Sequence, residues 1–115
     1  METRCLFEVY PHSASVRLFG LNRILPYKKG REASRRIALE SYRKLIEESL
    51  ASRRPSFVGN TLPVIGPGLH GLKECEDQLD ALLCAYVAAH FWYWGLARNN
   101  ILGNEENGWI VNPSF

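Results

Sequence analysis

The feature that most constrains the fold is a long helical pattern from about Leu72 to about Ala97. Its apolar side chains recur at the spacing of one helix face, and we expect them to point inward. This stripe consists of Leu72, Cys75, Leu79, Leu82, Leu83, Tyr86, His90 and Tyr93. Beyond Ala85 the segment is apolar nearly all round, which predicts burial on more than one side. The apolar run within it is shorter than the ~20 residues that span a bilayer, so we interpret it as a core helix.

Two shorter helices are predicted before this segment. Ser13 is a candidate N-cap for the first, and Gly20 is a candidate terminator. The second predicted helix begins at Ser34 and ends near Ser52. Its inward side chains are expected to be Ile37 and Leu45, with Tyr42 and Ile46 as further candidates.

Short strands are predicted at both ends of the chain. Residues 4–10 are rich in aromatic and β-branched side chains and are closed by Pro11, which is typical of a strand. Near the other end, Asn107 and Gly108 indicate a turn before a brief strand at 109–111. Residues 53–71 are interpreted as mainly loop, with room for one short strand at 63–65.

Length and composition indicate one domain spanning residues 1–115. The chain has 46% hydrophobic residues, which is enough for a real core. Cys5, Cys75 and Cys84 form no CxxC pair, and this scatter argues against a disulfide framework or a structural zinc site. Scattered thiols of this kind predict a reducing, cytoplasmic location, and the N-terminus shows no signal-peptide pattern. His90 is expected to be a packed, hydrogen-bonded core residue.

Charge is segregated along the sequence although the formal net charge is only +2. The segment from Arg23 to Arg54 holds ten Lys and Arg residues against four Glu residues, a net +6. The remaining residues carry a net −4. This pattern fits a polyanion-binding surface beside a metal site, and it also fits two faces of the fold that attract each other.

Carboxylates open the long helical segment. Asp77 and Asp80 lie three residues apart and Glu76 lies four before Asp80, so two or three acids can converge on one point. Such a group suits a divalent metal. The competing interpretation is that Glu76 and Asp77, like Glu74, only offset the helix dipole. Asp80 is harder to explain in this way, because it lies deeper in the helix among apolar residues.

Glu8 is a further candidate metal ligand. It lies two residues before the predicted N-terminal strand ends at Tyr10, where a buried carboxylate would be costly unless paired or bound to a metal. Together with Asp77 and Asp80 it could hold Mg²⁺ or Mn²⁺, which prefer oxygen ligands. It is equally consistent with the sequence that Glu8 faces solvent or pairs with a nearby arginine.

A basic segment between the two predicted shorter helices, together with the start of the second helix, is suited to phosphate contacts. Lys28, Lys29, Arg31 and Arg35 supply the positive charge, and Tyr27 is a candidate for stacking on a base. Taken alone, the same residues also describe an ordinary solvated loop.

Four blocks of the sequence, taken in order, resemble one known family. They are Phe7-Glu8-Val9-Tyr10-Pro11, Leu25-Pro26-Tyr27-Lys28-Lys29-Gly30-Arg31, the stretch from Asp77 to Tyr86, and Gly108-Trp109-Ile110-Val111-Asn112-Pro113. They look like the successive motifs of domain of unknown function family 429, regarded as predicted nucleases with a ribonuclease H-like fold. The resemblance implies an α/β fold with short central strands packed by two or three helices. It also implies that Glu8, Asp77 and Asp80 are metal-binding carboxylates of a two-metal nuclease site.

The chain departs from the family pattern at its N-terminus. Family members usually begin with hairpin strands that carry another metal-binding aspartate, whereas no aspartate precedes Asp77 here. The resemblance therefore implies the later half of a ribonuclease H-like domain, incomplete or inactive by itself.

Two functional hypotheses follow. The first is a metal-dependent nuclease-like domain that hydrolyses phosphodiesters in a nucleic acid. The second is a non-enzymatic assembly module that dimerises or pairs with a separately encoded N-terminal half. The aromatic run at 91–94 is too wide for one buried face of a lone helix and is expected to pack on such a partner.

Overall fold

The computed structural model describes residues 7–58, 62–104, 106 and 108–115. Helices dominate the first three quarters of the chain, and a β-hairpin closes it. In chain order the elements are α1 (Pro11–Phe19), α2 (Glu32–Ser49), a 3₁₀ turn (Leu50–Ser52), α3 (Gly68–Trp94), a second 3₁₀ turn (Gly95–Arg98), β1 (Asn99–Asn104) and β2 (Gly108–Pro113).

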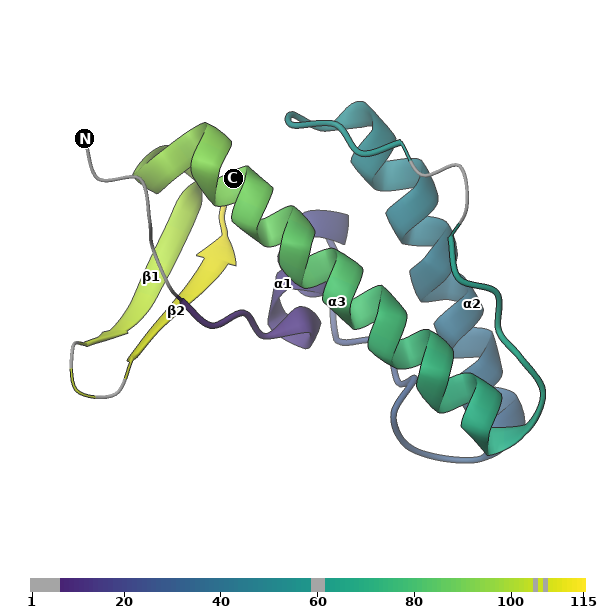
Figure 1. Cartoon of the computed structure of the whole chain (residues 1–115). Coiled ribbons are helices and arrows are strands. Elements are labelled where there is room, and N and C mark those ends of the chain that lie inside the picture. The colour runs from purple at the N-terminus through teal and green to yellow at the C-terminus, as the bar shows by residue number, and fades with distance from the viewer. Residues whose placement is uncertain (1–6, 59–61, 105, 107) are drawn as a thin grey trace.

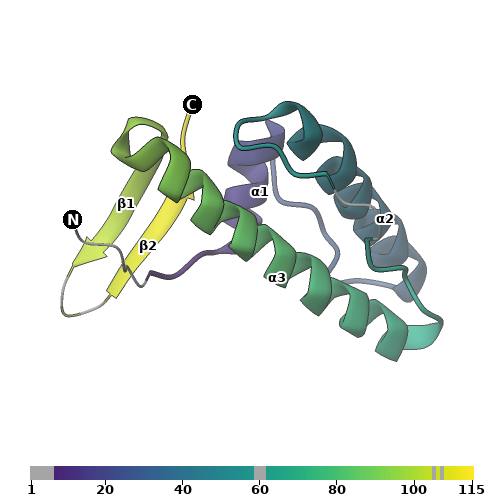
Figure 2. The same ribbon diagram turned by 45° about the horizontal axis from the view of Figure 1, so that its top comes forward.

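Helix α3 is the axis on which the other elements pack (Figure 1). Helix α2 lies beside its N-terminal half, α1 lies behind its middle, and the hairpin lies beside its C-terminal part. The turned view in Figure 2 keeps the hairpin and α2 at opposite ends of α3. The sheet thus lies at one end of the long helix, which differs from the central strands expected from the family resemblance.

Helix α1 confirms the predicted short helix but begins earlier. Its N-cap is Tyr10 and Pro11 occupies the first turn, so Ser13 is not the cap. Proline is favoured there because its missing N–H is not needed in the first turn. Gly20 ends the helix with φ of 63°, a left-handed conformation that favours glycine, and the predicted terminator is confirmed.

Helix α2 is confirmed, but its inward face was assigned partly wrongly. Ile37 is 69% exposed, whereas its neighbours Ala38 and Leu39 are buried. Tyr42 and Ile46 continue that buried face, and Leu45 lies at its margin, half-buried. The true inward positions follow a spacing of three to four residues that starts one residue later than Ile37.

The long apolar helix is confirmed as α3, and most of its predicted stripe is buried. Two stripe residues are not fully buried: Leu82 is partly buried and Tyr93 is half-exposed. The α-helix ends at Trp94 because Gly95 adopts a positive φ of 56°, and the remaining predicted helical residues form the 3₁₀ turn.

The hairpin contains one predicted strand and one that the sequence did not indicate. Strands β1 and β2 pair antiparallel, with Asn99 opposite Pro113 and Asn104 opposite Gly108. The strand predicted at 109–111 lies within β2, whereas β1 was assigned to no element. Asn107, half of the predicted turn signal, lies outside the described residues.

The N-terminal segment joins this sheet through Glu8. Its backbone N–H donates to the carbonyl of Trp109 at 2.7 Å, and the N–H of Val111 donates to the carbonyl of Glu8 at 3.0 Å. The result is one parallel bridge between Glu8 and Ile110. Residues 4–6 of the predicted strand lie outside the described residues, and residues 7, 9 and 10 form no regular strand.

Residues 62–66 are irregular, so the short strand suggested at 63–65 is wrong. Arginines from α2 hold this loop instead. Arg36 donates to the Gly66 carbonyl at 2.9 Å, and Arg43 donates to the Pro63 carbonyl at 2.8 Å. Side-chain donors thus satisfy carbonyls that would otherwise accept hydrogen bonds from the N–H groups of a strand partner.

Together these elements give a mixed fold of helices and a small antiparallel sheet, which confirms the α/β class in this coarse sense. One apolar cluster from all three helices continues to Val111 of β2. Within the described part of the chain, no helix is both long and apolar enough to cross a bilayer.

Candidate functional site

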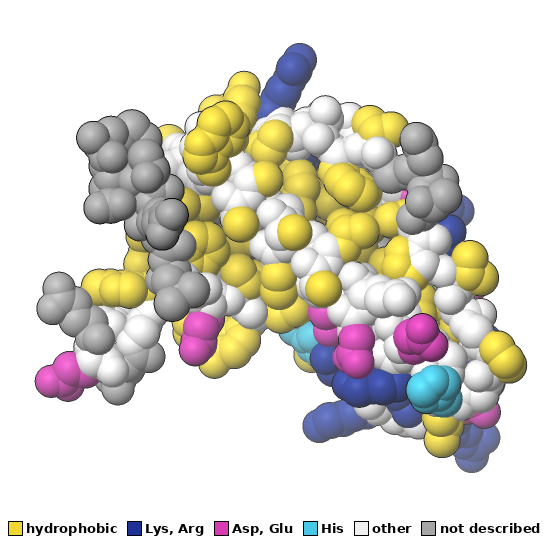
Figure 3. Space-filling model, in the orientation of Figure 1, with side chains coloured by type: hydrophobic (Ala, Val, Ile, Leu, Met, Phe, Trp, Pro, Cys, Tyr) yellow, Lys and Arg dark blue, Asp and Glu magenta, His cyan; other side chains and the backbone are white. Residues whose placement is uncertain are grey.

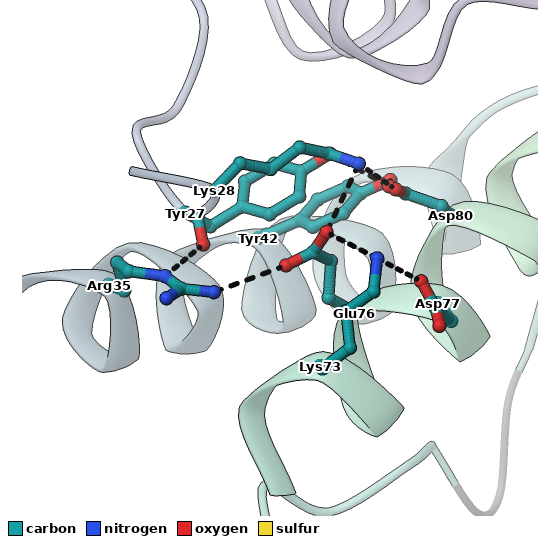
Figure 4. A network of polar contacts seen from close by, with 8 residues as sticks. All are labelled: Tyr27, Lys28, Arg35, Tyr42, Lys73, Glu76, Asp77 and Asp80. Atoms are coloured by element: carbon teal, nitrogen blue, oxygen red, sulfur yellow. Dashed lines mark hydrogen bonds and ion pairs between the residues drawn. The ribbon is translucent and has the colours of Figure 1, made fainter. Parts of the chain in front are cut away.

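Three acids of α3 take different positions near the N-terminal half of the helix (Figure 4). Glu76 is buried, and the Asp80 side chain is 15% exposed, so both face the α2 side of the helix. Asp77 is 60% exposed and lies on the outer side. The i, i+4 spacing explains the difference, because residues four apart lie on one helix face and Asp77 lies about a quarter turn away.

Glu76 and Asp80 converge on a single cation, the ammonium group of Lys28. Lys28 Nζ lies 3.1 Å from Glu76 Oε1 and 3.0 Å from Asp80 Oδ2. Partial burial acts to lower the pKa of Lys28, but its bonds to Asp80 and Glu76 outweigh this and raise the pKa. Lys28 is therefore a firmly charged ammonium between two carboxylates in the neutral pH range.

The other oxygen of Asp80 is held by two tyrosines. The hydroxyl groups of Tyr27 and Tyr42 both donate to Asp80 Oδ1, at 2.7 and 3.0 Å, and the two rings stack with centroids 4.7 Å apart. Burial, together with the charge of Asp80, raises the pKa of both phenols well above the usual range. Both phenols are thus fixed donors, and Asp80 is ligated on both of its oxygens.

Two more cations complete the network around Glu76. Arg35 Nη2 lies 3.8 Å from Glu76 Oε2, while Arg35 Nε donates to the carbonyl of Tyr27 at 3.3 Å. Lys73 Nζ lies 3.6 Å from Glu76 Oε1 and 3.0 Å from Asp77 Oδ1. Three acids thus face three bases, and the network is close to neutral. It joins α3 to α2 and to the loop that carries Lys28.

The structure does not bring the three predicted metal ligands together in one described cluster. Glu8 is exposed beside β2, and its described contacts are the backbone bonds of the sheet bridge. Asp77 forms an ion pair with Lys73, whereas Asp80 forms one with Lys28. Among the described residues, no group of three or more His, Cys, Asp or Glu side chains is placed to hold a metal ion. The donor atoms of Glu76 and Asp80 are of the type that Mg²⁺ prefers, but Lys28 occupies the position between them.

The predicted nucleic-acid residues divide into two groups. Lys28 and Arg35 are engaged with the acids of α3, and Tyr27 is buried with its ring against Tyr42 and His12. A base could stack on Tyr27 only after a neighbouring ring had moved. Lys29 and Arg31 are exposed, and neither forms an ion pair within the described residues, so both are available to phosphate.

The remaining histidine prediction concerns the core. His90 is buried and its Nδ1 lies 2.9 Å from Asn99 Oδ1, which confirms a packed, hydrogen-bonded histidine. Burial is the largest influence on it and lowers its pKa. Burial also raises the pKa of the Cys84 thiol, which keeps it in the unreactive form.

Sequence reasoning missed the roles of Glu76 and Tyr42 at this site. The four-residue spacing of Glu76 from Asp80 indicated that the two acids share a helix face, but Glu76 was not chosen as a ligand because an acid near a helix start also offsets the helix dipole. Tyr42 was only a candidate core residue. Its spacing gave no indication that the hydroxyl meets Asp80, because that contact depends on how α2 packs on α3.

Comparison with known proteins places the chain in a family. The family described as protein of unknown function (DUF429) matches residues 2–106. No curated protein and no solved structure gives a significant match. Because the family match covers most of the chain and includes Glu8, the Lys28 loop and the acids of α3, this chain belongs to the DUF429 family.

Proposed function

We propose that this chain is a nuclease-like, nucleic-acid-binding domain of ribonuclease H-like type whose acidic site is closed by Lys28. The observation that carries the proposal is the convergence of Glu76 and Asp80 on one cation, at 3.1 and 3.0 Å from Lys28 Nζ. Two carboxylates that converge on an ammonium group offer the oxygen ligands a hard divalent cation requires once the lysine has left. In the closed arrangement, the chain by itself is inactive.

Mg²⁺ or Mn²⁺ bound at this position would activate water and stabilise a leaving phosphate oxygen. The chain's own residues would hold the site in place. Tyr27 and Tyr42 fix Asp80 through one oxygen and leave the other oxygen pointing to the cation position. Asp77 and Glu8 are proposed as additional metal-binding carboxylates. Both side chains are exposed, and neither contacts Asp80 in the described structure.

The basic loop supports the nucleic-acid part of the proposal. Lys29 and Arg31 lie in the same loop as Lys28 and are exposed, so a phosphate backbone can approach the acids along positively charged side chains. Such contacts supply affinity without reading a base sequence. A backbone phosphate beside Lys28 would also compete with Glu76 and Asp80 for the ammonium group, which gives the closed site a route to opening.

Thermal unfolding with added Mn²⁺ tests the proposal. Replacing Lys28 by alanine removes the competing ammonium, so Mn²⁺ should raise the Tm of Lys28→Ala more than that of the wild type. Lys29→Ala is the matched control, because Lys29 is exposed in the same loop and touches neither acid. Adding Asp80→Asn to Lys28→Ala should abolish the Mn²⁺ effect. Absence of any Mn²⁺-dependent rise in both the wild type and Lys28→Ala would refute the metal site.

Activity is tested with labelled RNA and DNA oligonucleotides in Mg²⁺ or Mn²⁺. We expect no cleavage by the isolated wild type and salt-sensitive binding that weakens in Lys29→Ala and Arg31→Ala. If the wild type cleaves and Asp80→Asn still cleaves, catalysis does not depend on this acidic site. Binding that is insensitive to salt would remove the phosphate role.

An assembly module is the second candidate function. The observation that favours it is the exposure of large apolar side chains at the end of α3, with Trp92 81% exposed and Leu96 73% exposed. Neighbouring exposed apolar side chains of this size form the kind of patch that marks an interaction surface. Light scattering on the purified chain tests the self-assembling form of this candidate, because a chain that stays monomeric at all concentrations does not dimerise.

A further inference from the structure

A pocket lies between the N-terminal part of α1 and the loop that follows this helix. We call it the Tyr10 pocket. Its volume is about 650 Å³, within the range of about 300–1,000 Å³ that is usual for small-molecule sites. Its walls are mostly apolar and include Tyr10, Val16 and Ile24, while His12 and Lys28 contribute polar groups. Tyr10 is 56% exposed and Ile24 is 48% exposed, so both are open to a ligand that enters from solvent.

One polar atom in the wall of the Tyr10 pocket lacks a partner. Among the described residues, none forms a hydrogen bond with Nε2 of His12, although this atom is shielded from solvent. The His12 ring is held in place against the ring of Tyr27, with centroids 4.9 Å apart. A shielded nitrogen without a hydrogen bond is unfavourable, and a ligand with a polar edge in this pocket is placed to supply the missing partner.

The Tyr10 pocket and the acidic site share Lys28. This residue lines the pocket, and its Nζ lies 3.1 Å from Glu76 Oε1 and 3.0 Å from Asp80 Oδ2. In Figure 4 the side chain of Lys28 runs along the ring of Tyr27 toward Asp80. A ligand that fills the pocket therefore lies next to the two carboxylates. A phosphate attached to such a ligand would meet the Lys28 ammonium group.

Further basic side chains lie close to the Tyr10 pocket. Lys29 and Arg31 follow Lys28 in the loop and are exposed. In Figure 3, Lys and Arg side chains gather at the lower edge of the view, next to acidic side chains over the N-terminal half of α3. Phosphates that run past the pocket would meet these cations, whereas the apolar walls suit a flat ring. A flat ring with a phosphate beside it is the chemistry of a nucleotide.

We propose that the Tyr10 pocket holds one unpaired base of a single-stranded nucleic acid, with the base stacked on Tyr10 and the adjoining phosphate beside Lys28. A base inside a duplex lies between its stacked neighbours, so it cannot enter the pocket without leaving the stack. The bound base would hold the adjoining phosphodiester against Glu76 and Asp80. This inference rests on the proposed nuclease-like function, and it adds the form of nucleic acid that the site accepts and the residue that selects it.

Fluorescence anisotropy with labelled oligonucleotides tests the strand preference. Single strands of RNA and of DNA are compared with the duplexes of the same sequence at one salt concentration. The single strand that binds more tightly should have a Kd at least about fivefold below that of its duplex, because only an unpaired base can fill the pocket. In NMR spectra of the wild type, the same single strand should shift the amide signals of residues 10–16 more than those of β1.

Substitution of Tyr10 tests the stacking contact. Tyr10→Ala should raise the single-strand Kd at least about fivefold, whereas Tyr10→Phe keeps the ring and should preserve the affinity. The dependence of Kd on salt should stay the same in Tyr10→Ala, because stacking displaces no counterions. Tyr93→Ala is the matched control: it removes the same side chain from another half-exposed position, on α3, and should leave the Kd unchanged. Circular dichroism confirms that the variants fold.

Three results overturn the pocket proposal. They are no oligonucleotide binding at all, equal binding of single strand and duplex, and single-strand binding that Tyr10→Ala leaves intact. If binding depends on Lys29 and Arg31 but not on Tyr10, the phosphate role of the basic loop stands and the pocket is wrong. The Mn²⁺-dependent rise in the Tm of Lys28→Ala involves neither Tyr10 nor an oligonucleotide, so the metal site and the pocket can fail separately.

Discussion

At the scale of single residues, Asp80 has polar partners on both of its carboxylate oxygens. It accepts from Tyr27 and Tyr42 through one oxygen and from Lys28 through the other. A carboxylate that is largely removed from water costs free energy unless its oxygens are paired, and here three donors meet that need. The network therefore serves stability whether or not a metal ever replaces Lys28.

Replacing Asp80 by asparagine should lower the free energy of unfolding by about 2–3 kcal/mol. The amide loses the ion pair with Lys28, and its NH₂ donor group takes the place of one of the two acceptor oxygens. Asp77→Asn is the control, because Asp77 is 60% exposed and should change stability by less than about 1 kcal/mol. Urea unfolding measures both values. Equal effects of the two substitutions would contradict the structural role of Asp80.

The buried histidine predicts how stability depends on pH. Burial lowers the pKa of folded His90 below its unfolded value of 6.5, and the nearby charges of Arg53 and Arg98 act in the same direction, although Asn99 opposes them. The unfolded state therefore binds the proton first. Stability is fully present above pH 6.5 and falls as pH drops from there, by at most about 1.4 kcal/mol per pH unit for each such histidine.

Urea unfolding from pH 7.5 to 5 measures this dependence. His90→Gln should reduce the slope below pH 6.5, and part should persist because burial also lowers the pKa of His12. His70→Gln is the control, since the His70 side chain is 93% exposed and should leave the slope unchanged. A slope that His90→Gln does not alter would show that His90 makes no contribution.

At the scale of elements, the start of α3 depends on a close approach between two glycines. A Cβ added at Gly71 would lie 2.7 Å from the Cα of Gly66 and closer still to its carbonyl group. Arg36 donates to that same carbonyl, so the loop is held from one side by α2 and met from the other by α3. The glycine at position 71 is thus required by packing rather than by backbone conformation.

Gly71→Ala should therefore lower the free energy of unfolding by about 1–3 kcal/mol. Helix propensity alone predicts the opposite sign, since alanine is favoured over glycine inside a helix by about 1 kcal/mol. Gly66→Ala is the control: its Cβ would meet the Gly71 Cα at 3.4 Å, an acceptable contact, and should cost less than about 1 kcal/mol. Thermal unfolding compares the two, and a stabilised Gly71→Ala would disprove the close approach.

At the scale of the whole molecule, the hairpin and the helices are unequally buried. Strand β1 is exposed beyond Asn99, whereas α3 buries residues along most of its length. We expect native-state hydrogen exchange to show β1 opening at a lower free energy than the middle of α3, because few apolar contacts oppose its separation. If β1 and the middle of α3 exchange with the same free energy of opening, this prediction is wrong.

How well the sequence predicted each element depends on how far apart in the chain the interacting residues lie. Helices α1 and α3 were placed to within a few residues, because their apolar spacing and the closing residue Gly20 are local signals. Ile37 was misplaced because a helix with apolar residues on neighbouring positions does not reveal which of them meets the core. Strand β1 was missed because Asn99–Asn104 has little β-branched character and pairs only through β2.

The sequence by itself determined that α3 would be a buried helix with Glu76 and Asp80 on one face, because helix geometry fixes which residues align. It also placed His90 in the core. Only the tertiary structure decided what those acids bind. The packing of α2 and the path of the loop bring Tyr27, Tyr42 and Lys28 to Asp80, and contacts between segments so distant in the chain are set by how the elements pack, not by local sequence.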